Sequence, residues 1–297
     1  EGEFVISGDL YSAETGEMTY KMVDVGNPVV YNFKERDCQG TPMYAVENGY
    51  YYYFTLTGIT AIQMNDVIEA RLYMVKEGVT YVSPVDLYSV ATYAYAQMNK
   101  TTVARELQCL CADLLRYGAA AQVFKAYRTD ALADAAMTEA HKAFLSDINA
   151  VSFNSNKGDL GDFENPAITW AGRALDLNSK VVVKFAFRVN DPAINVEDLT
   201  AKITYVNYKG ETVTATVDSA ELYIAASNVY AFSFDQLLAA ELRSVLNCVV
   251  YNGETRVSST SFYSVDTYGN GKSGALLDVC KALIAYSDTA LVFFNTL

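Results

Sequence analysis

Alternation of apolar and polar side chains is the clearest pattern in the second half of the chain. Residues 181–189 place Val or Phe at every second position, with Lys184 among the side chains between them. Successive side chains of a strand point to opposite faces of a sheet, so this spacing predicts a β-strand with one face in a core. Two further alternating stretches, 201–208 and 211–217, flank Lys209-Gly210, which predicts a hairpin turn. The same pattern in the first half predicts strands near residues 3–7, 18–24, 28–34, 50–57 and 67–76.

Apolar residues also recur at helical spacing. One such series predicts a helix with a single buried face, made by Val103, Leu107, Leu110, Leu114 and Gly118. A second series lies in the alanine-rich stretch 129–148, at Leu132, Met137, Phe144 and Ile148. We expect this second stretch to form a helix that connects two parts of the chain.

Three blocks of sequence occur twice in the same order, which indicates an internal repeat. The paired blocks are YYFTL (52–56) with YAFSF (230–234), YSVATY (88–93) with YSVDTY (263–268), and CADLLRYGAAAQVF (111–124) with CKALIAYSDTALVF (280–293). The chain is therefore predicted to be an α+β protein of two similar lobes. Each lobe is expected to be a β-sandwich-like sheet unit followed by packed helices, and a helix joins the two.

The length of 297 residues also favours two units, because one compact domain rarely grows so large. We expect lobe one at 1–128, with strands and then a helical pair, and lobe two at 150–297, with strands and then a terminal helix. The connecting helix is expected at 129–149. A composition of 51% hydrophobic and 19% charged residues is typical of a folded chain.

The net charge of the chain limits the classes of ligand that we expect it to bind. The net charge of −13 repels phosphate backbones and anionic lipid surfaces. No apolar run approaches the roughly 18 to 20 residues of a membrane span. We therefore expect neither nucleic acid binding nor membrane insertion. A neutral ligand suits the chain better, and the 23 tyrosines offer it rings and hydroxyl groups.

Residues that most enzymes use are scarce. His141 is the only histidine and lies on the apolar side of the predicted connecting helix, so we expect it to be partly buried and hydrogen-bonded rather than catalytic. One histidine cannot form a multi-histidine metal site, and no nucleotide-binding loop is present. Carboxylate pairs are numerous, so a glycoside hydrolase remains a less favoured alternative. The expectation is a protein without catalysis, cofactor or metal.

Two groups of residues resemble metal or redox ligands. The five cysteines match neither a zinc signature nor a dense disulfide scaffold, and the repeat pairs Cys111 with Cys280, which we expect to be small buried hydrophobes. Asp159, Asp162 and Glu164 could hold Ca²⁺, but their spacing is not that of an EF-hand loop. A solvated loop at 158–165 is the favoured interpretation.

Aromatic residues are the remaining candidates for function. Those that recur in both copies are expected to serve the core: Tyr88 with Tyr263, Tyr93 with Tyr268, and Tyr117 with Tyr286. Tyr51 and Tyr53 correspond to Val229 and Ala231 and point away from the face that the copies share. They could form a flat platform for sugar rings or another protein. The alternative is that helices cover this face, which would make both tyrosines part of a second core.

Trp170, Tyr205 and Tyr208 complete the predicted ligand-binding residues. Trp170 alternates with Ile168 and is expected to face the core, where its indole N–H needs a partner, but it could also contact a ligand. Tyr205 and Tyr208 flank the hairpin at Lys209-Gly210 and face opposite sides. At most one of them is therefore expected in the core.

Two long segments resemble a known family. YSVATYAYAQM with the following LCADLLRYGAAAQVFKAYRTDALAD, and ITWAGRALDLNSKVVVKFAF, are similar to modules repeated in secreted, cell-surface and cellulosome-like proteins of gut Firmicutes. Within this family, residues 45–297 most resemble the bilobed starch-binding domains of Ruminococcus amylosome proteins. The resemblance implies an extracellular location on the cell surface, often beside a dockerin, and a groove between the lobes that holds helical α-1,4-glucan.

The resemblance and the residues together leave two functions open. The first is non-catalytic binding of starch and maltooligosaccharides through aromatic contacts in the groove between the lobes. The second is a structural or protein-docking role, because tyrosine-rich faces also occur at protein interfaces.

Overall fold

The computed structural model describes residues 2–297 except 8, 13–18, 23–28, 34–43, 47–48, 52–55, 57, 77–78, 83, 156–157 and 178–179. Side chains are described from residue 56 onward, leaving aside 57, 71–78, 80–83, 156–157 and 178–179. The fold is α+β, as predicted. Every pairing between described strands is antiparallel.

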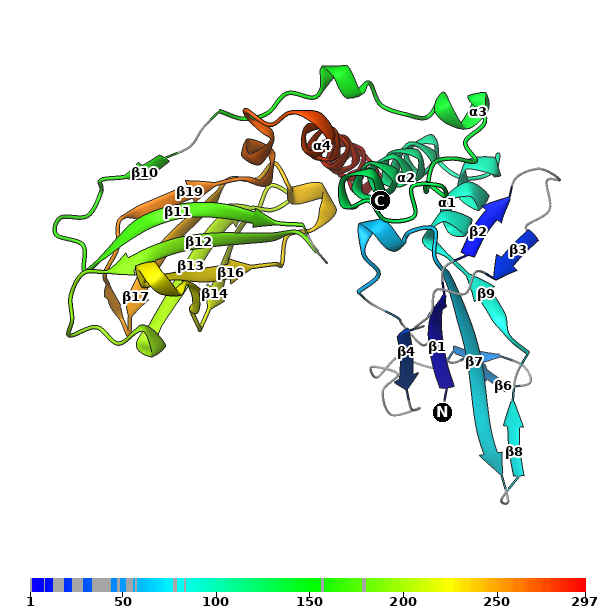
Figure 1. The fold of residues 1–297 in the computed structure, drawn as a ribbon, viewed down its shortest axis with the longest axis horizontal. Helices are drawn as coiled ribbons and strands as arrows, with labels where there is room; N and C mark the ends of the chain where they lie inside the picture. Colours follow the sequence, from blue (N-terminus) through cyan, green and yellow to red (C-terminus); the bar gives the residue numbers. More distant parts are fainter. Residues whose placement is uncertain are drawn as a thin grey trace.

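The described residues between 158 and 263 form two antiparallel sheets that lie in two layers (Figure 1). Their strands are β10 (Gly158–Leu160), β11 (Ile168–Asp176), β12 (Val182–Val189), β13 (Leu199–Val206), β14 (Thr212–Val217), β15 (Glu221–Ile224), β16 (Val229–Phe234), β17 (Leu246–Asn252), β18 (Thr255–Arg256) and β19 (Thr260–Tyr263). One sheet has the order β10-β19-β17-β13-β14 with β18 on β17, and the other has the order β11-β12-β16-β15. Phe185 and Phe232 of the second sheet share one buried core with Ile203 and Val250 of the first. The two sheets therefore pack as a sandwich.

The period-two pattern predicted this sandwich well. Val183, Phe185 and Phe187 of β12 are fully buried, so the alternation at 181–189 does mark a core face. The turn between β13 and β14 also lies where Lys209-Gly210 predicts it. Gly210 adopts φ +80°, a left-handed conformation that glycine reaches without strain, and its N–H donates to the Asn207 carbonyl at 3.0 Å.

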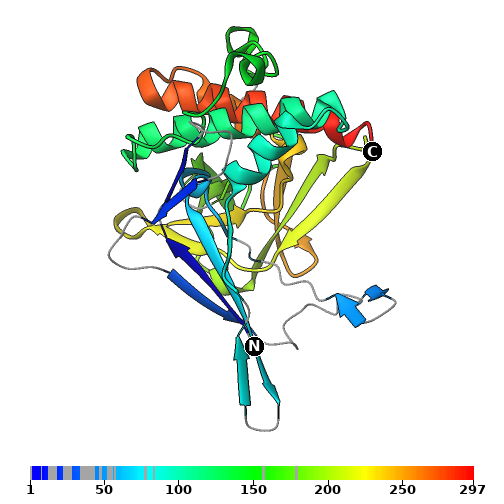
Figure 2. The same cartoon turned by 90° about the vertical axis from the view of Figure 1, so that its right-hand side faces the viewer.

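Three long helices pack on one another and on the sandwich core. They are α1 (Val90–Asn99), α2 (Arg105–Lys125) and α4 (Gly274–Phe294). The helical pair α1 and α2 follows the first strands, and α4 follows the last strand. Figure 2 shows α2 and α4 side by side and antiparallel. The rings of Tyr117 and Tyr286, which the repeat pairs, stack between these helices with centroids 6.0 Å apart and planes 8° apart.

The YSV-TY blocks begin alike and then diverge. Ser89 and Ser264 precede the helical turns with nearly the same extended backbone, φ −147° and ψ 162° against φ −136° and ψ 156°. The first block continues into α1, whereas the second forms the short 3₁₀ helix η7 (Val265–Gly269). The expectation that both copies bury their tyrosines is wrong for Tyr88 and Tyr93, which are 46% and 40% exposed. Tyr88 ends the short strand β9, and Tyr93 lies on the outer face of α1.

The predicted connecting helix at 129–149 does not form. The segment folds as turns, with only α3 (Glu139–Lys142) and the 3₁₀ helix η3 (Ile148–Ala150). Side chains from elsewhere bind its backbone instead. The Ala131 carbonyl accepts from the amides of Gln122 and Asn65, and the Ala133 carbonyl accepts from the Tyr95 hydroxyl at 3.0 Å. These bonds replace the main-chain bonds that a helix would need.

The N-terminal part contains short strands, described here by their backbone. They are β1 (Gly2–Ser7), β2 (Asp9–Ser12), β3 (Thr19–Met22), β4 (Val29–Phe33), β5 (Tyr44–Val46), β6 (Gly49–Tyr51), β7 (Val67–Lys76), β8 (Val79–Val82) and β9 (Asp86–Tyr88). One sheet has the order β4-β1-β7-β8 with β9 on β7, and two hairpins pair β2 with β3 and β5 with β6.

Candidate functional site

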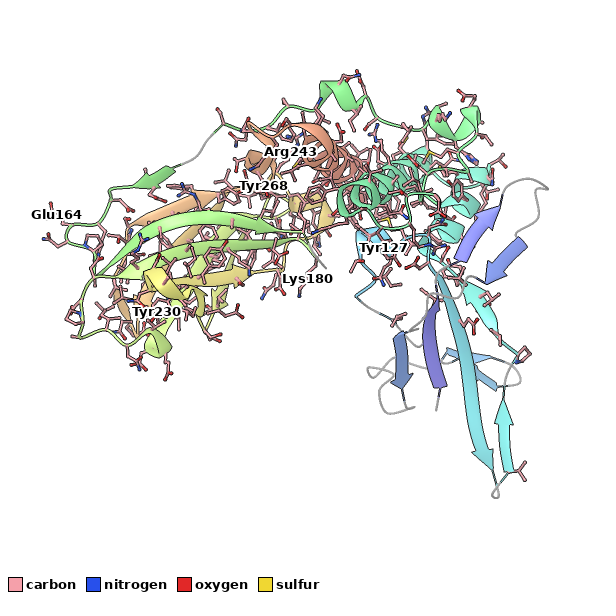
Figure 3. All side chains as sticks on the ribbon, viewed as in Figure 1. Tyr127, Glu164, Lys180, Tyr230, Arg243 and Tyr268 are labelled. Atoms are coloured by element: carbon pink, nitrogen blue, oxygen red, sulfur yellow. The ribbon has the colours of Figure 1, made fainter. Side chains whose placement is uncertain are left out.

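A pocket of about 260 Å³ opens where the C-terminal end of α2 meets the sheet that contains β11, β12 and β15. We call it the junction pocket. Its lining residues are Phe124 and Lys125 of α2, Ala174, Leu175 and Asp176 of β11, Leu177, Lys184 of β12, Tyr223 of β15, Tyr268 of η7 and Leu276 of α4. Figure 3 labels Tyr268 between α4 and the strands of the sandwich. The pocket thus combines segments that are up to about 150 positions apart in sequence.

Each aromatic ring of the junction pocket has a lysine beside it. The Lys184 ammonium lies 5.8 Å from the centre of the Tyr223 ring, and the Lys125 ammonium lies 5.3 Å from that of Phe124. Lys272 lies 4.4 Å from the centre of the Tyr268 ring. Such cation–π contacts are attractive and hold the amine next to the ring face. The pocket therefore presents flat apolar surfaces and hydrogen-bond donors together.

A bulge in β15 places Tyr223. Leu222 pairs with Tyr230 and Ile224 pairs with the adjacent Val229, so Tyr223 is the extra residue between two paired positions. Bulges redirect a side chain and are frequent next to functional sites. Tyr223 is 43% exposed, and its ring can therefore accept a ligand without unfolding of the strand.

The C-terminal end of α2 forms one wall of the pocket, and the chain turns directly after it. Hydrogen bonds to the buried Asp66 carboxylate hold this turn in place. Ala126 and Arg128 have φ of 51° and 44°, a left-handed conformation that costs non-glycine residues free energy. Asp66, which is 3% exposed, accepts hydrogen bonds from the Tyr127 hydroxyl at 2.7 Å and from Arg128 at 2.6 Å. These bonds hold the turn in place next to Phe124.

The Tyr268 hydroxyl of the pocket stays protonated near neutral pH. Burial raises the pKa of the Tyr268 hydroxyl, and the neighbouring Cys280 and Tyr223 raise it further. A neutral hydroxyl can both donate and accept a hydrogen bond. The charged groups in the lining are Lys125, Lys184 and Asp176, and the last two lie 4.0 Å apart.

A second hollow of about 380 Å³ lies between α2, α4 and the segment 132–149. Its polar lining residues are Arg116, Asp134, Asn149, Asp278 and Lys281, and the rest are aliphatic. No aromatic ring lines it among the described residues. Arg116 already donates to Ser146 and pairs with Asp113, which gives it a structural role.

The predicted ligand-binding residues do not gather at one place. Trp170 packs edge-on against Phe185 and Phe187, and its indole N–H donates to the Ser259 carbonyl at 3.1 Å, so it has the partner that burial requires. Tyr205 is only 7% exposed and presents no open face to a ligand. Tyr208 is half-buried beside Phe294, with ring centroids 5.5 Å apart. As predicted, only one of the two hairpin tyrosines is in the core.

The proposed platform of Tyr51 and Tyr53 lies outside the described side chains, and only the backbone of Tyr51 is described, in β6. Its counterpart in the second half is described. Val229 and Ala231 are 2% and 1% exposed and form a small buried cluster with Ala186. The equivalent face of the second sheet is therefore covered.

The expected solvated loop at 158–165 is wrong for Gly158–Leu160, which form β10, and two carboxylates of this segment bind arginines. Asp159 pairs with Arg173, and Asp162 pairs with Arg256 at 2.9 Å while it also accepts from the Thr260 N–H. Each of these carboxylates thus has a guanidinium group as its partner. No group of three or more His, Cys, Asp or Glu that could hold a metal ion exists within the part of the chain that the structure describes.

His141 and the paired cysteines have the structural roles expected of them. His141 is 6% exposed, its Nε2 lies 2.8 Å from the Asn99 side-chain oxygen, and burial lowers its pKa. Cys111 and Cys280 are buried, which raises the pKa of their thiols to about 12 and about 11. Thiols with such pKa values are poor nucleophiles and poor metal ligands at neutral pH.

Sequence reasoning missed Phe124 and Tyr223 and set Tyr268 aside as structural. The repeat pairs Tyr268 with Tyr93, and this pairing was the reason to assign it to the core. Nothing in the local sequence marks Tyr223, because its position depends on a bulge. One short strand carries three large exposed apolar side chains, Leu222, Tyr223 and Ile224. Their exposure points to a binding surface, but it is known only from the structure.

Two further findings bear on classification. No helix among the described residues is long and apolar enough to cross a membrane. Comparison with known proteins finds no family model, no curated protein and no solved structure that matches this chain.

Proposed function

We propose that this chain is a non-catalytic starch-binding module of a bacterial surface protein and that it binds α-1,4-glucan in the junction pocket. The observation that carries the proposal is the gathering of Phe124, Tyr223 and Tyr268, each with a lysine beside it, in one open pocket. Binding sites for small molecules combine apolar and aromatic walls with a few polar groups that fix orientation. A sugar ring can stack on the aromatic faces while its hydroxyls bind the amines.

We further propose that the pocket is the groove between two lobes, at 1–128 and 150–297. The reason is that α2 belongs to the first copy of the repeat, whereas β11, β12 and β15 belong to the second. The stacking of Tyr117 on Tyr286 supports this arrangement, because equivalent residues then meet at the contact between copies.

The ligand class follows from charge and from the resemblance. A chain of net charge −13 attracts no anionic polymer at long range, and a neutral glucan avoids this repulsion. The similarity to starch-binding domains of amylosome proteins favours α-1,4-linked glucan, an extracellular position on the cell surface, and neighbouring domains such as a dockerin.

Affinity electrophoresis tests the proposal. In native gels cast with amylopectin, the wild-type protein should be retarded relative to gels without polysaccharide, and gels with the anionic polymer pectin should show no retardation. The Tyr223→Ala variant should migrate in amylopectin gels almost as fast as it does in gels without polysaccharide. Tyr251→Ala is the matched control, because Tyr251 also carries a lysine, Lys202 at 4.6 Å, but lies outside the pocket. Equal mobility of wild type with and without amylopectin would refute the proposal.

If the module were a glycoside hydrolase, a different experimental result would be expected. Hydrolysis of glycosides needs two carboxyl groups about 5 to 9.5 Å apart across the scissile bond. The described lining of the junction pocket has one carboxylate, Asp176. Incubation with soluble starch should therefore release no new reducing ends beyond a buffer control. Release that is lost in Asp176→Asn would show that the module is an enzyme.

Protein docking is the second candidate, and one observation favours it. β15 is the last strand of its sheet, and Leu222 and Ile224 on it are 55% and 46% exposed. Exposed apolar edge strands can pair with a strand of another protein. Leu222→Lys should leave retardation by amylopectin unchanged if glucan binding is the function of this region.

A further inference from the structure

The turn that follows α2 contains two residues in a conformation that side chains with a Cβ atom disfavour. Ala126 and Arg128 have φ of 51° and 44°, in the left-handed region. Ala126 caps the helix, and the next N–H, that of Tyr127, donates to the Gln122 carbonyl at 2.9 Å. Caps of this form usually place glycine at the left-handed position. Strained residues persist where surrounding contacts hold them, and they are frequent at functional sites.

A buried carboxylate from outside the helix contacts this turn. Asp66 accepts hydrogen bonds from the two side chains after Ala126, the Tyr127 hydroxyl at 2.7 Å and the Arg128 guanidinium at 2.6 Å. Figure 3 labels Tyr127 close to the segment that leads into β7. Burial raises the pKa of the Asp66 carboxyl, whereas these two hydrogen bonds lower it. The turn therefore supplies the donors that a buried carboxylate needs, and the carboxylate offsets the strain of the turn.

The turn connects the pocket wall to a distant part of the chain. Phe124 and Lys125 are the last two residues of α2, directly before the turn, and both line the junction pocket. Asp66 lies 61 positions before Tyr127 and directly precedes β7, which pairs with β1, β8 and β9. The place of Phe124 and Lys125 in the pocket therefore depends on a residue at the start of the longest N-terminal strand.

The neighbouring Asn65 differs from Asp66 in what it binds. The two residues are similarly buried, at 5% and 3% exposed. The Asn65 amide donates to the Ala131 carbonyl at 3.3 Å, beyond the turn. Loss of the Asn65 side chain should therefore destabilise the fold without releasing residues 126–128. This difference separates a general structural role from an effect on the pocket.

We propose that Asp66 is a positioning residue of the junction pocket, which keeps Phe124 and Lys125 in the pocket wall by holding the left-handed turn at 126–128. Asp66 is buried and does not line the pocket, so it acts through the turn and not by contact with a ligand. The inference rests on the proposed function for the identity of the ligand. The position of the pocket wall can be measured without one.

The Asp66→Asn variant tests the inference, because it keeps the shape of the side chain and one acceptor oxygen but removes the charge that faces Arg128. Its affinity for maltoheptaose, measured by calorimetry, should fall about fivefold or more, the effect of losing one ring contact. The amide NMR signals of Phe124 and Lys125 should shift in the variant without ligand. Asn65→Ala, the matched control, should lower the melting temperature but keep the wild-type affinity and the wild-type signals of Phe124 and Lys125.

A second substitution tests the role of strain. Glycine reaches the left-handed conformation without strain, so the turn needs less support when glycine replaces Ala126. The double variant Asp66→Asn/Ala126→Gly should therefore recover part of the affinity that Asp66→Asn loses. A double variant that binds no better than Asp66→Asn would contradict the inference.

The possible failures are distinguishable. Wild-type affinity and unchanged Phe124 and Lys125 signals in Asp66→Asn would overturn the inference and leave the proposed function intact. If the wild type binds no maltoheptaose, the proposed function fails, and the signals of the two single variants without ligand still decide whether Asp66 positions the pocket wall. If Asp66→Asn does not fold, Tyr127→Phe removes one of the two hydrogen bonds and takes its place with the same measurements.

Discussion

Rings and amines decide what the junction pocket can hold. Tyr223 offers an open face, Tyr268 a neutral hydroxyl, and Lys184 a donor that lies beside a ring and 4.0 Å from Asp176. A stacked ring contributes on the order of 1 kcal/mol, while association costs several, so one ring is not sufficient. Three rings in one pocket are consistent with dissociation constants of about 10 μM to 1 mM for oligosaccharides.

Trp170 should matter for stability and not for binding. Trp170→Phe removes the hydrogen bond from the indole N–H to the Ser259 carbonyl and leaves that carbonyl without this donor. We expect a loss of about 1–3 kcal/mol in the free energy of unfolding, measured by chemical denaturation. Affinity for maltoheptaose should stay within about twofold of wild type. A large loss of affinity with unchanged stability would instead make Trp170 a ligand contact, as the sequence allows.

Asp162 should give the stability a pH dependence. Hydrogen bonds from Arg256 and from the Thr260 N–H lower its pKa to about 2. A carboxylate with a lowered pKa stabilises the fold above its unfolded pKa near 4, and this contribution disappears as the pH falls to 2. Asp162→Asn should therefore lower the melting temperature at pH 7 by about 1–3 °C, a modest effect because the pair is partly exposed.

The same difference in melting temperature should shrink as the pH falls from 4 to 2. Asp218→Asn is the control, because Asp218 is exposed, and it should change the melting temperature little at any pH. An Asp162→Asn deficit that stays constant down to pH 2 would contradict the assignment of the low pKa.

At the scale of elements, the contact of α2 with its neighbours leaves no room for a side chain at Gly118. A Cβ atom there would lie 2.8 Å from Met64 Sδ, 3.2 Å from Ala133 Cβ and 3.2 Å from the Ala61 carbonyl oxygen. Ala133 belongs to the turn segment that replaces the expected connecting helix. The close approach of α2 to this turn is thus one reason why the turn has its shape.

Gly118→Ala should destabilise the protein although it lies within a helix. Alanine gains up to about 1 kcal/mol over glycine in a helix, but the overlap with Ala133 and the Ala61 carbonyl costs about 1–3 kcal/mol. We expect a net loss of about 1 kcal/mol in the free energy of unfolding, measured by urea denaturation. Gly161→Ala, where nothing lies within 4 Å, should be close to neutral. A more stable Gly118→Ala would show that the turn can move away.

Elements that depend on residues close together in the sequence could be predicted. Elements that depend on contacts with residues far away in the sequence could not. β12 and the β13–β14 hairpin follow from alternation and from Gly210, which act within a few residues. The segment 129–149 has a helical pattern, but Asn65 and Tyr95, 66 and 38 positions away, bind its backbone. The junction pocket was missed for the same reason, because a bulge in one strand and the end of a distant helix create it.

At the scale of the whole molecule, the sequence repeat brings two equivalent helices into contact. The equivalent helices α2 and α4 meet at Tyr117 and Tyr286, and Val123 and Val292 near their C-terminal ends are exposed.

The most direct test of the central claim is a map of the bound glucan on the protein. Amide NMR spectra recorded during titration with maltoheptaose should show their largest shifts at residues 174–177, at Lys184, at 221–224 and at Tyr268, which line or border the junction pocket. Shifts of this kind in wild type, absent in Tyr223→Ala and retained in Tyr251→Ala, are the predicted result. Spectra that do not change at millimolar maltoheptaose, or that change only at residues outside the junction pocket, would contradict the account.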